Sequence, residues 1–95
     1  MMYRRSPAVE ETPVGERLVL YNRITGSAAV LSPTASILWV ELTSERDRGH
    51  LEKVLIDKFP RVDPSRIKSD VESCLIEMKK CQLVSDSPGP IGKQQ

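Results

Sequence analysis

Three side chains in this sequence of 95 residues have the chemistry of a nucleophile or a base: the single histidine, His50, and the two cysteines, Cys74 and Cys81. His50 could activate a cysteine only if the fold brought the two together, and no spacing in the sequence supports such a Cys–His pair. We interpret His50 as an exposed residue near the start of a helix. The sequence therefore predicts no catalytic site.

The two cysteines lie seven residues apart in a segment with helical periodicity. Two helical turns place their Cα atoms roughly 10 Å apart, whereas a disulfide needs them within about 7 Å. We expect free, partly buried thiols in a reducing compartment. A structural zinc ion usually takes four Cys or His ligands, and the chain has two Cys and one His, so no metal site is expected.

The acidic residues do not converge either. Asp70 and Glu77 share one face of a predicted helix, whereas Glu10, Glu11 and Glu72 lie elsewhere. On residue types alone we interpret the acidic pair as part of a solvated face. None of the five glycines belongs to a phosphate-binding loop that leads into a helix, so we expect no cofactor.

Charge and hydropathy exclude further classes. Fourteen basic residues face thirteen acidic ones, for a net charge of +1, which gives no bulk attraction to nucleic acid or to an anionic membrane. No run approaches the ~20 apolar residues that cross a bilayer. Residues 1–9 lack the apolar stretch of a secretory signal. We expect a cytoplasmic protein with neither nucleic acid nor membrane as a partner.

The first half of the chain favours strands. Residues 17–23 and 27–31 are short β-favouring runs, and a turn that contains Gly26 joins them as a hairpin. Residues 8–12 could add a strand in front, which Pro13 is expected to end. These segments predict a three-stranded antiparallel sheet.

The second half favours three helices. Ser32–Pro33 and Asp63–Pro64 each combine a capping side chain with a proline at the first helical position. The second helix is expected over residues 51–59, after a loop at 43–49, and the third from 64 to about 80. Apolar residues at helical spacing give the predicted core: Leu38, Trp39, Leu55, Phe59, Val71 and Leu75.

This order of elements predicts one α+β domain, winged-helix-like, with a three-stranded antiparallel sheet followed by three helices. The domain is expected over residues 8–84. Residues 1–7 are short and basic, and residues 85–95 are rich in Pro, Gly and polar side chains. We predict a flexible amino-terminal segment and a disordered carboxy-terminal tail.

The predicted strand at 27–31 is the feature most suited to binding. It has no Lys, no Pro and no inward charge, so nothing in it resists pairing with another strand if it lies at a sheet edge. With the margin of the last helix it could form a groove that takes an extended peptide by strand addition. The alternative is that Ala28 and Ala29 merely pack under a helix and a terminus covers the edge.

A family resemblance rests on three stretches in order: LVLYNRITG, AVLSPTASILWVEL and DPSRIKSDVESCLIEMKKCQLV. Residues 18–84 resemble the PqqD-like family, the precursor-recognition elements of ribosomally synthesised and post-translationally modified peptides (RiPPs). Thr25–Gly26 in the hairpin is more similar to the stand-alone modules of lasso-peptide pathways than to those of pyrroloquinoline quinone (PQQ) synthesis. The sequence departs from the family at Ser32, where Asn is frequent, and at residues 43–49, which replace an Asp–Gly turn and leave the start of the second helix open.

The resemblance implies a non-catalytic peptide chaperone that binds the leader of a precursor peptide and presents it to a maturation enzyme, either a leader peptidase or a radical SAM protein. The leader would add as a strand beside the third strand and pack on the third helix. Asp70 is the polar position expected to touch it. The peptide-binding residues that the resemblance implies are Ser27, Ala28, Ala29, Val30, Leu31, Arg66, Ile67, Asp70, Val71, Ser73, Cys74 and Glu77.

Two alternatives stay open. A winged-helix DNA-binding protein has the same order of elements, but its last helix should present a basic face. Here acidic residues interrupt the basic ones along residues 64–80. A structural subunit could instead dimerise through the same bare strand edge.

Overall fold

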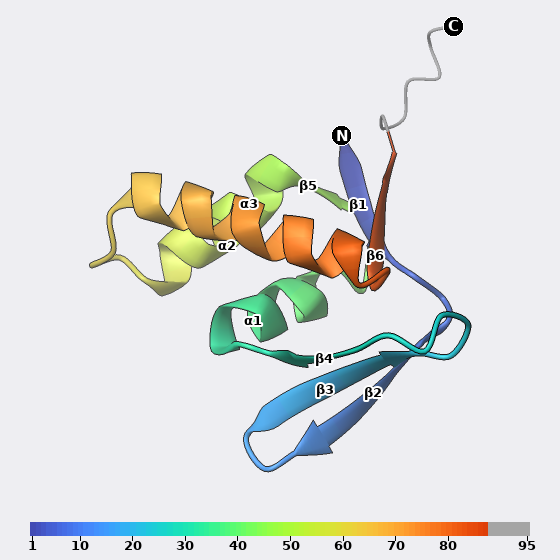
Figure 1. Cartoon of the computed structure of the whole chain (residues 1–95). Coiled ribbons are helices and arrows are strands. Elements are labelled where there is room, and N and C mark those ends of the chain that lie inside the picture. The colour runs from blue at the N-terminus through green and yellow to red at the C-terminus, as the bar shows by residue number, and fades with distance from the viewer. Residues whose placement is uncertain (88–95) are drawn as a thin grey trace, which may run out of the picture.

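The computed structural model describes residues 1–87. It confirms an α+β fold with three helices and a three-stranded antiparallel sheet in the winged-helix order (Figure 1). A second small sheet, which the sequence did not predict, accompanies them. The elements are β1 (Met2–Arg5), β2 (Val9–Val14), β3 (Arg17–Asn22), β4 (Ala28–Leu31), α1 (Pro33–Glu41), β5 (Arg46–Asp47), α2 (Arg48–Lys58), α3 (Pro64–Lys80) and β6 (Val84–Ser87).

The predicted sheet has the strand order β2-β3-β4. Its inner face carries Leu20 and Leu31, both buried. Pro13 does not end β2, as expected, but lies inside it opposite Leu18. Ala8 accepts a hydrogen bond from the Arg23 N–H, and because hydrogen-bonded pairs alternate along an antiparallel ladder, Pro13 falls where its nitrogen points away from β3. An edge strand tolerates proline in that position.

Each helix begins at a capping side chain. Ser32 Oγ accepts the Ala35 N–H at 3.1 Å, and Asp63 Oδ1 accepts the Ser65 N–H at 2.8 Å, as both cap-plus-proline signals predicted. The start of α2 was predicted too late. Asp47 Oδ1 caps it through the His50 N–H at 2.8 Å, so residues 46–49 form β5 and the first turn of α2 rather than a loop.

The second sheet has the order β5-β1-β6. The prediction that residues 1–7 are flexible is wrong for Met2–Arg5, which form β1 and pair with β6 from Met2↔Ser87 to Arg5↔Val84. Residues 85–87, expected in the tail, belong to β6, and residues 88–95 lie outside the described residues. The strands β1 and β6 lie side by side in Figure 1 although they stand near opposite ends of the sequence, so no local pattern marks their pairing.

One hydrophobic core fills the space between the helices and the inner face of the β2-β3-β4 sheet. The predicted core residues Leu38, Trp39, Leu55, Val71 and Leu75 are all buried in it. Phe59 was predicted there and is 38% exposed instead. The helix α2 ends one residue earlier, and the cap conformation at position 59 (φ −125°, ψ 69°) takes the ring off the inner face. No helix within residues 1–87 has both the length and the apolar character to cross a lipid bilayer.

Candidate functional site

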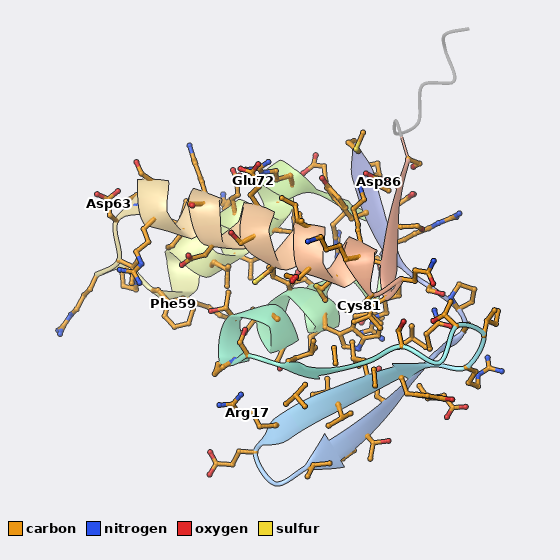
Figure 2. The ribbon with its side chains drawn as sticks, in the orientation of Figure 1. Arg17, Phe59, Asp63, Glu72, Cys81 and Asp86 are labelled. Atoms are coloured by element: carbon orange, nitrogen blue, oxygen red, sulfur yellow. The ribbon has the colours of Figure 1, made fainter. Side chains whose placement is uncertain are left out.

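A groove of about 280 Å³ runs between β4 and the carboxy-terminal half of α3, beside the start of α1. Its walls are mostly apolar. Figure 2 labels one of its lining residues, Cys81, beside the last turn of α3. We call it the β4–α3 groove. Its lining residues are Ala29, Val30, Leu31, Ser32, Ala35, Ser73, Cys74, Glu77, Met78, Cys81 and Leu83.

The strand wall of the β4–α3 groove is an open sheet edge. Within residues 1–87, β4 pairs with β3 alone. The Asn22 N–H donates to the Ser27 carbonyl at 2.8 Å, which fixes which pairs of this ladder share hydrogen bonds. By alternation, the backbone groups of Ala29 and Leu31 point to β3, and those of Ala28 and Val30 point to the open side.

The other edge of the same sheet is less suited to accept a strand. The outer strand β2 contains Pro13 and the charged residues Glu10 and Glu11, features that blunt an edge against pairing. Glu11 is also held in an ion pair with Arg5 at 3.1 Å. The edge of β4 has neither proline nor charge. This edge, whose lack of proline and charge was noted in the sequence, borders the β4–α3 groove.

Side chains of β4 alternate between the two faces of the sheet. Leu31 is 4% exposed and belongs to the core, and Ala29 packs against the core from the same face. Val30, on the opposite face, is 62% exposed. An added strand would alternate in the same way, so every second side chain of a bound peptide would turn toward α3.

The helix wall carries Ser73, Cys74, Glu77 and Cys81, spaced so that they share one face of α3. Both cysteines are free, as predicted, and both are half-buried. Burial raises the pKa of the Cys74 thiol, and the negative charge of Asp70 adds to the effect. This shift favours the neutral thiol, which suits an apolar wall.

A second hollow of about 250 Å³ lies farther toward the amino end of α3. It takes in three of the predicted site residues, Arg66, Ile67 and Asp70, together with Phe59. Arg66 and Asp70 approach each other only to 4.0 Å and are both more than half exposed. Figure 2 shows Phe59 toward the opposite end of the helical layer from Cys81.

The structure thus divides the predicted site. Ala29, Val30, Leu31, Ser73, Cys74 and Glu77 come together in the β4–α3 groove. Arg66, Ile67 and Asp70 line the second hollow. Ser27 and Ala28 continue the edge without lining either hollow, and Val71 is fully buried in the core.

Sequence reasoning missed five lining residues of the groove: Ser32, Ala35, Met78, Cys81 and Leu83. Met78 and Cys81 follow Cys74 at helical spacing, so extending the predicted face of the last helix by two turns finds them. Ser32 and Ala35 belong to the cap of α1. Their place beside α3 depends on tertiary packing.

The groups singled out for catalysis lie apart. His50 Nε2 lies 3.0 Å from Glu41 Oε1, where it joins the start of α2 to the end of α1, and it does not line the groove that holds the cysteines. Within residues 1–87, no three Cys, His, Asp or Glu side chains gather in a way that could hold a metal ion.

Fold and groove together define a winged-helix-like module with an open strand edge beside an apolar helix wall. No family model matches the sequence, and no curated protein matches it. Two solved structures share the fold. TbiB1 in complex with the TbiA(beta) leader peptide superposes with a TM-score of 0.77 at 19% identity, over 88% of this chain and 96% of that one. A lasso peptide synthetase B1 complexed with the leader peptide gives 0.73 at 15% identity, over 88% and 98%.

Proposed function

We propose that this chain is a non-catalytic RiPP recognition element of the lasso-peptide type, which binds the leader segment of a ribosomally synthesised precursor peptide. One observation carries the proposal: the edge of β4, which pairs with no other strand within residues 1–87, adjoins an apolar groove against α3. Two proteins with this fold were solved with leader peptides bound. The PQQ-type assignment has no comparable support.

Strand addition supplies the affinity. Ala28 and Val30 each offer one N–H and one C=O on the open side of β4. Each backbone hydrogen bond made there contributes about 0.5–1.5 kcal/mol net. These contacts do not depend on the peptide's side chains, so they hold the leader in extended form without selecting its sequence.

The groove supplies the selectivity. Ala29, Leu31 and Met78 give it an apolar floor, and Glu77 stands exposed at its rim. We infer that the leader places an apolar side chain against this floor. Asp70 lies about one helical turn beyond, where it can meet a polar group of the leader.

The module would then present the held precursor to a maturation enzyme, a leader peptidase or a radical SAM protein, in the cytoplasm. DNA binding is less well supported, because acidic side chains form ion pairs with basic side chains on or near α3. Arg48 pairs with Glu72 at 3.2 Å and Lys79 pairs with Asp86 at 2.6 Å. These ion pairs reduce the positive charge that α3 and its neighbours could offer to phosphates.

The test is an NMR and calorimetric titration with a synthetic peptide that covers the leader of a precursor encoded beside the gene. We expect saturable binding with amide shifts at residues 28–31 and 73–81. A scrambled peptide of the same composition is the control. Equal binding of both peptides, or shifts confined to residues outside the groove, would contradict the proposal. Concentration-dependent association without peptide, through the same edge, would favour the dimerising subunit, and saturable binding to duplex DNA would favour the DNA-binding alternative.

A further inference from the structure

Asn22, at the end of β3, is the only buried polar residue in the part of the chain that the structure describes, with 3% of its surface exposed. Its side chain uses both ends. Oδ1 accepts the N–H groups of Ile24 and Thr25 at 2.9 and 3.1 Å. Nδ2 donates to the Gln82 carbonyl at 2.7 Å. A turn motif at residues 22–25 accounts for only the first two of these contacts.

The partner of Asn22 is itself unusual. Gln82 has φ 58° and is the only non-glycine residue with positive φ among residues 1–87. It follows the cap of α3, where its N–H donates to the Lys79 carbonyl at 3.0 Å and the Leu83 N–H donates to the Met78 carbonyl at 2.9 Å. This is the Schellman pattern, whose left-handed position is usually glycine. Here a glutamine occupies that position, and its carbonyl accepts the hydrogen bond from Asn22.

These two residues anchor opposite walls of the β4–α3 groove. On the strand side, Asn22 N–H donates to the Ser27 carbonyl at 2.8 Å, directly before β4. On the helix side, Gln82 stands between Cys81 and Leu83, which both line the groove. Within the described chain, the Asn22–Gln82 bond is the only hydrogen bond that joins residues 17–31 to residues 64–83.

We propose that Asn22 is a positioning residue of the groove: through Gln82 it fixes the separation of β4 from α3. Apolar packing alone is not directional, whereas this partly buried hydrogen bond of 2.7 Å sets both a distance and an orientation. The groove is thereby held open in one geometry before a peptide arrives. The expected effect of Asn22 on peptide binding rests on the proposed function. Its expected effect on the geometry of the groove in the free protein does not.

Asn22→Asp isolates the bond between the walls. A carboxylate still accepts the Ile24 and Thr25 N–H groups but cannot donate to the Gln82 carbonyl. We expect methyl NOEs across the groove, from Ala29 and Leu31 to Met78, to weaken in the free protein. The Kd for the leader peptide should rise about tenfold, since the strand and helix must then be ordered on binding.

Asn22→Ser is the second variant, for the case that the buried carboxylate prevents folding. Its hydroxyl can still accept a turn N–H but is too short to reach Gln82. Asp47→Ala is the matched control, because it removes the cap of α2 without touching the groove. It should lower the melting temperature while the NOEs and the Kd stay as in the wild type, which separates positioning from general stability.

The outcomes are distinguishable. Wild-type NOEs in the folded Asn22 variants would overturn the positioning role. Altered NOEs with an unchanged Kd would overturn its expected effect on peptide binding. If the wild type binds no leader peptide but the NOEs weaken as expected, the role of Asn22 in setting the groove stands and the proposed function fails.

Discussion

The guanidinium of Arg5 lies over the indole of Trp39, 4.2 Å from the ring centroid, and its Nη2 donates to the main-chain carbonyl of the same tryptophan at 2.6 Å. A second nitrogen, Nη1, pairs with Glu11 at 3.1 Å. One side chain on β1 therefore holds the end of α1 and the outer strand β2. This cation also sits near the negative end of the α1 dipole, where positive charge is favourable.

Arg5→Ala should lower the free energy of unfolding by about 2 kcal/mol, because it removes the ring contact and the hydrogen bonds together. Urea denaturation followed by circular dichroism measures the change. Arg5→Lys should recover little of it, since an ammonium cannot stack flat or donate as a fork. Arg4→Ala is the control: Arg4 is exposed, and within residues 1–87 its side chain donates one hydrogen bond, to Ser85 Oγ at 3.5 Å, so its loss should stay within about 0.5 kcal/mol. Equal losses for the two arginines would contradict this assignment.

Proline substitutions separate the two sides of β4. Val30→Pro removes an N–H that points to the open edge, so the hairpin should remain folded while the Kd for the leader peptide rises roughly five- to tenfold. Ala29→Pro removes an N–H directed at β3 and should unfold the hairpin. Calorimetry gives the affinity and thermal denaturation gives the stability. Unchanged affinity in a folded Val30→Pro protein would move the binding edge elsewhere.

Local signals predicted much of this fold. Ser32–Pro33 and Asp63–Pro64 marked two helix starts correctly because the cap and its proline are adjacent in sequence. The pairing of β1 with β6 escaped prediction, since Met2 and Ser87 share no local pattern. Phe59 was placed in the core because apolar spacing does not reveal where a helix ends.

The same limit applies to the site. The bare edge at residues 28–31 was readable from composition, and the structure places a groove beside it. The sequence could not predict that α3 contributes to two separate hollows. Ser73 lies in the groove beside β4, whereas Asp70 lies in the second hollow with Phe59, and this difference depends on tertiary packing. The hydrogen bond from Asn22 Nδ2 reaches a carbonyl 60 residues away in the sequence, which no turn motif predicts.

Gln82→Gly should stabilise the free protein by about 0.5 kcal/mol. Glycine takes the left-handed conformation without a Cβ clash, and part of the gain is offset by the larger freedom of the unfolded chain. The Gln82 carbonyl, and with it the bond from Asn22, is retained. Thermal denaturation measures the effect; a destabilised variant would show that the side chain at position 82 makes a contact of its own.

Alkylation of Cys74 gives a pH-dependent test. Because burial and Asp70 raise the pKa of this thiol, its thiolate population at neutral pH is lower than that of an exposed thiol, and the rate should keep rising at pH values where a small-molecule thiol has levelled off. Reaction with iodoacetamide, read by mass spectrometry of the Cys74 peptide, follows the rate. Leader peptide should slow it further, because Cys74 lines the groove. A scrambled peptide controls for non-specific protection, and equal protection by both would count against the groove as the binding site.

The pairing of β1 with β6 has a consequence for how the molecule is made. The strands β2, β3 and β4 follow one another through short turns and can assemble as soon as they leave the ribosome. The strand β1, which contains Met2, cannot pair with β6 until the chain has been synthesised as far as Ser87. Until then β1 can pair only with the two-residue strand β5, so the contact between Arg5 and Trp39 should become stable late in synthesis. Nascent chains that lack residues 84–87 should therefore expose β1 to proteolysis.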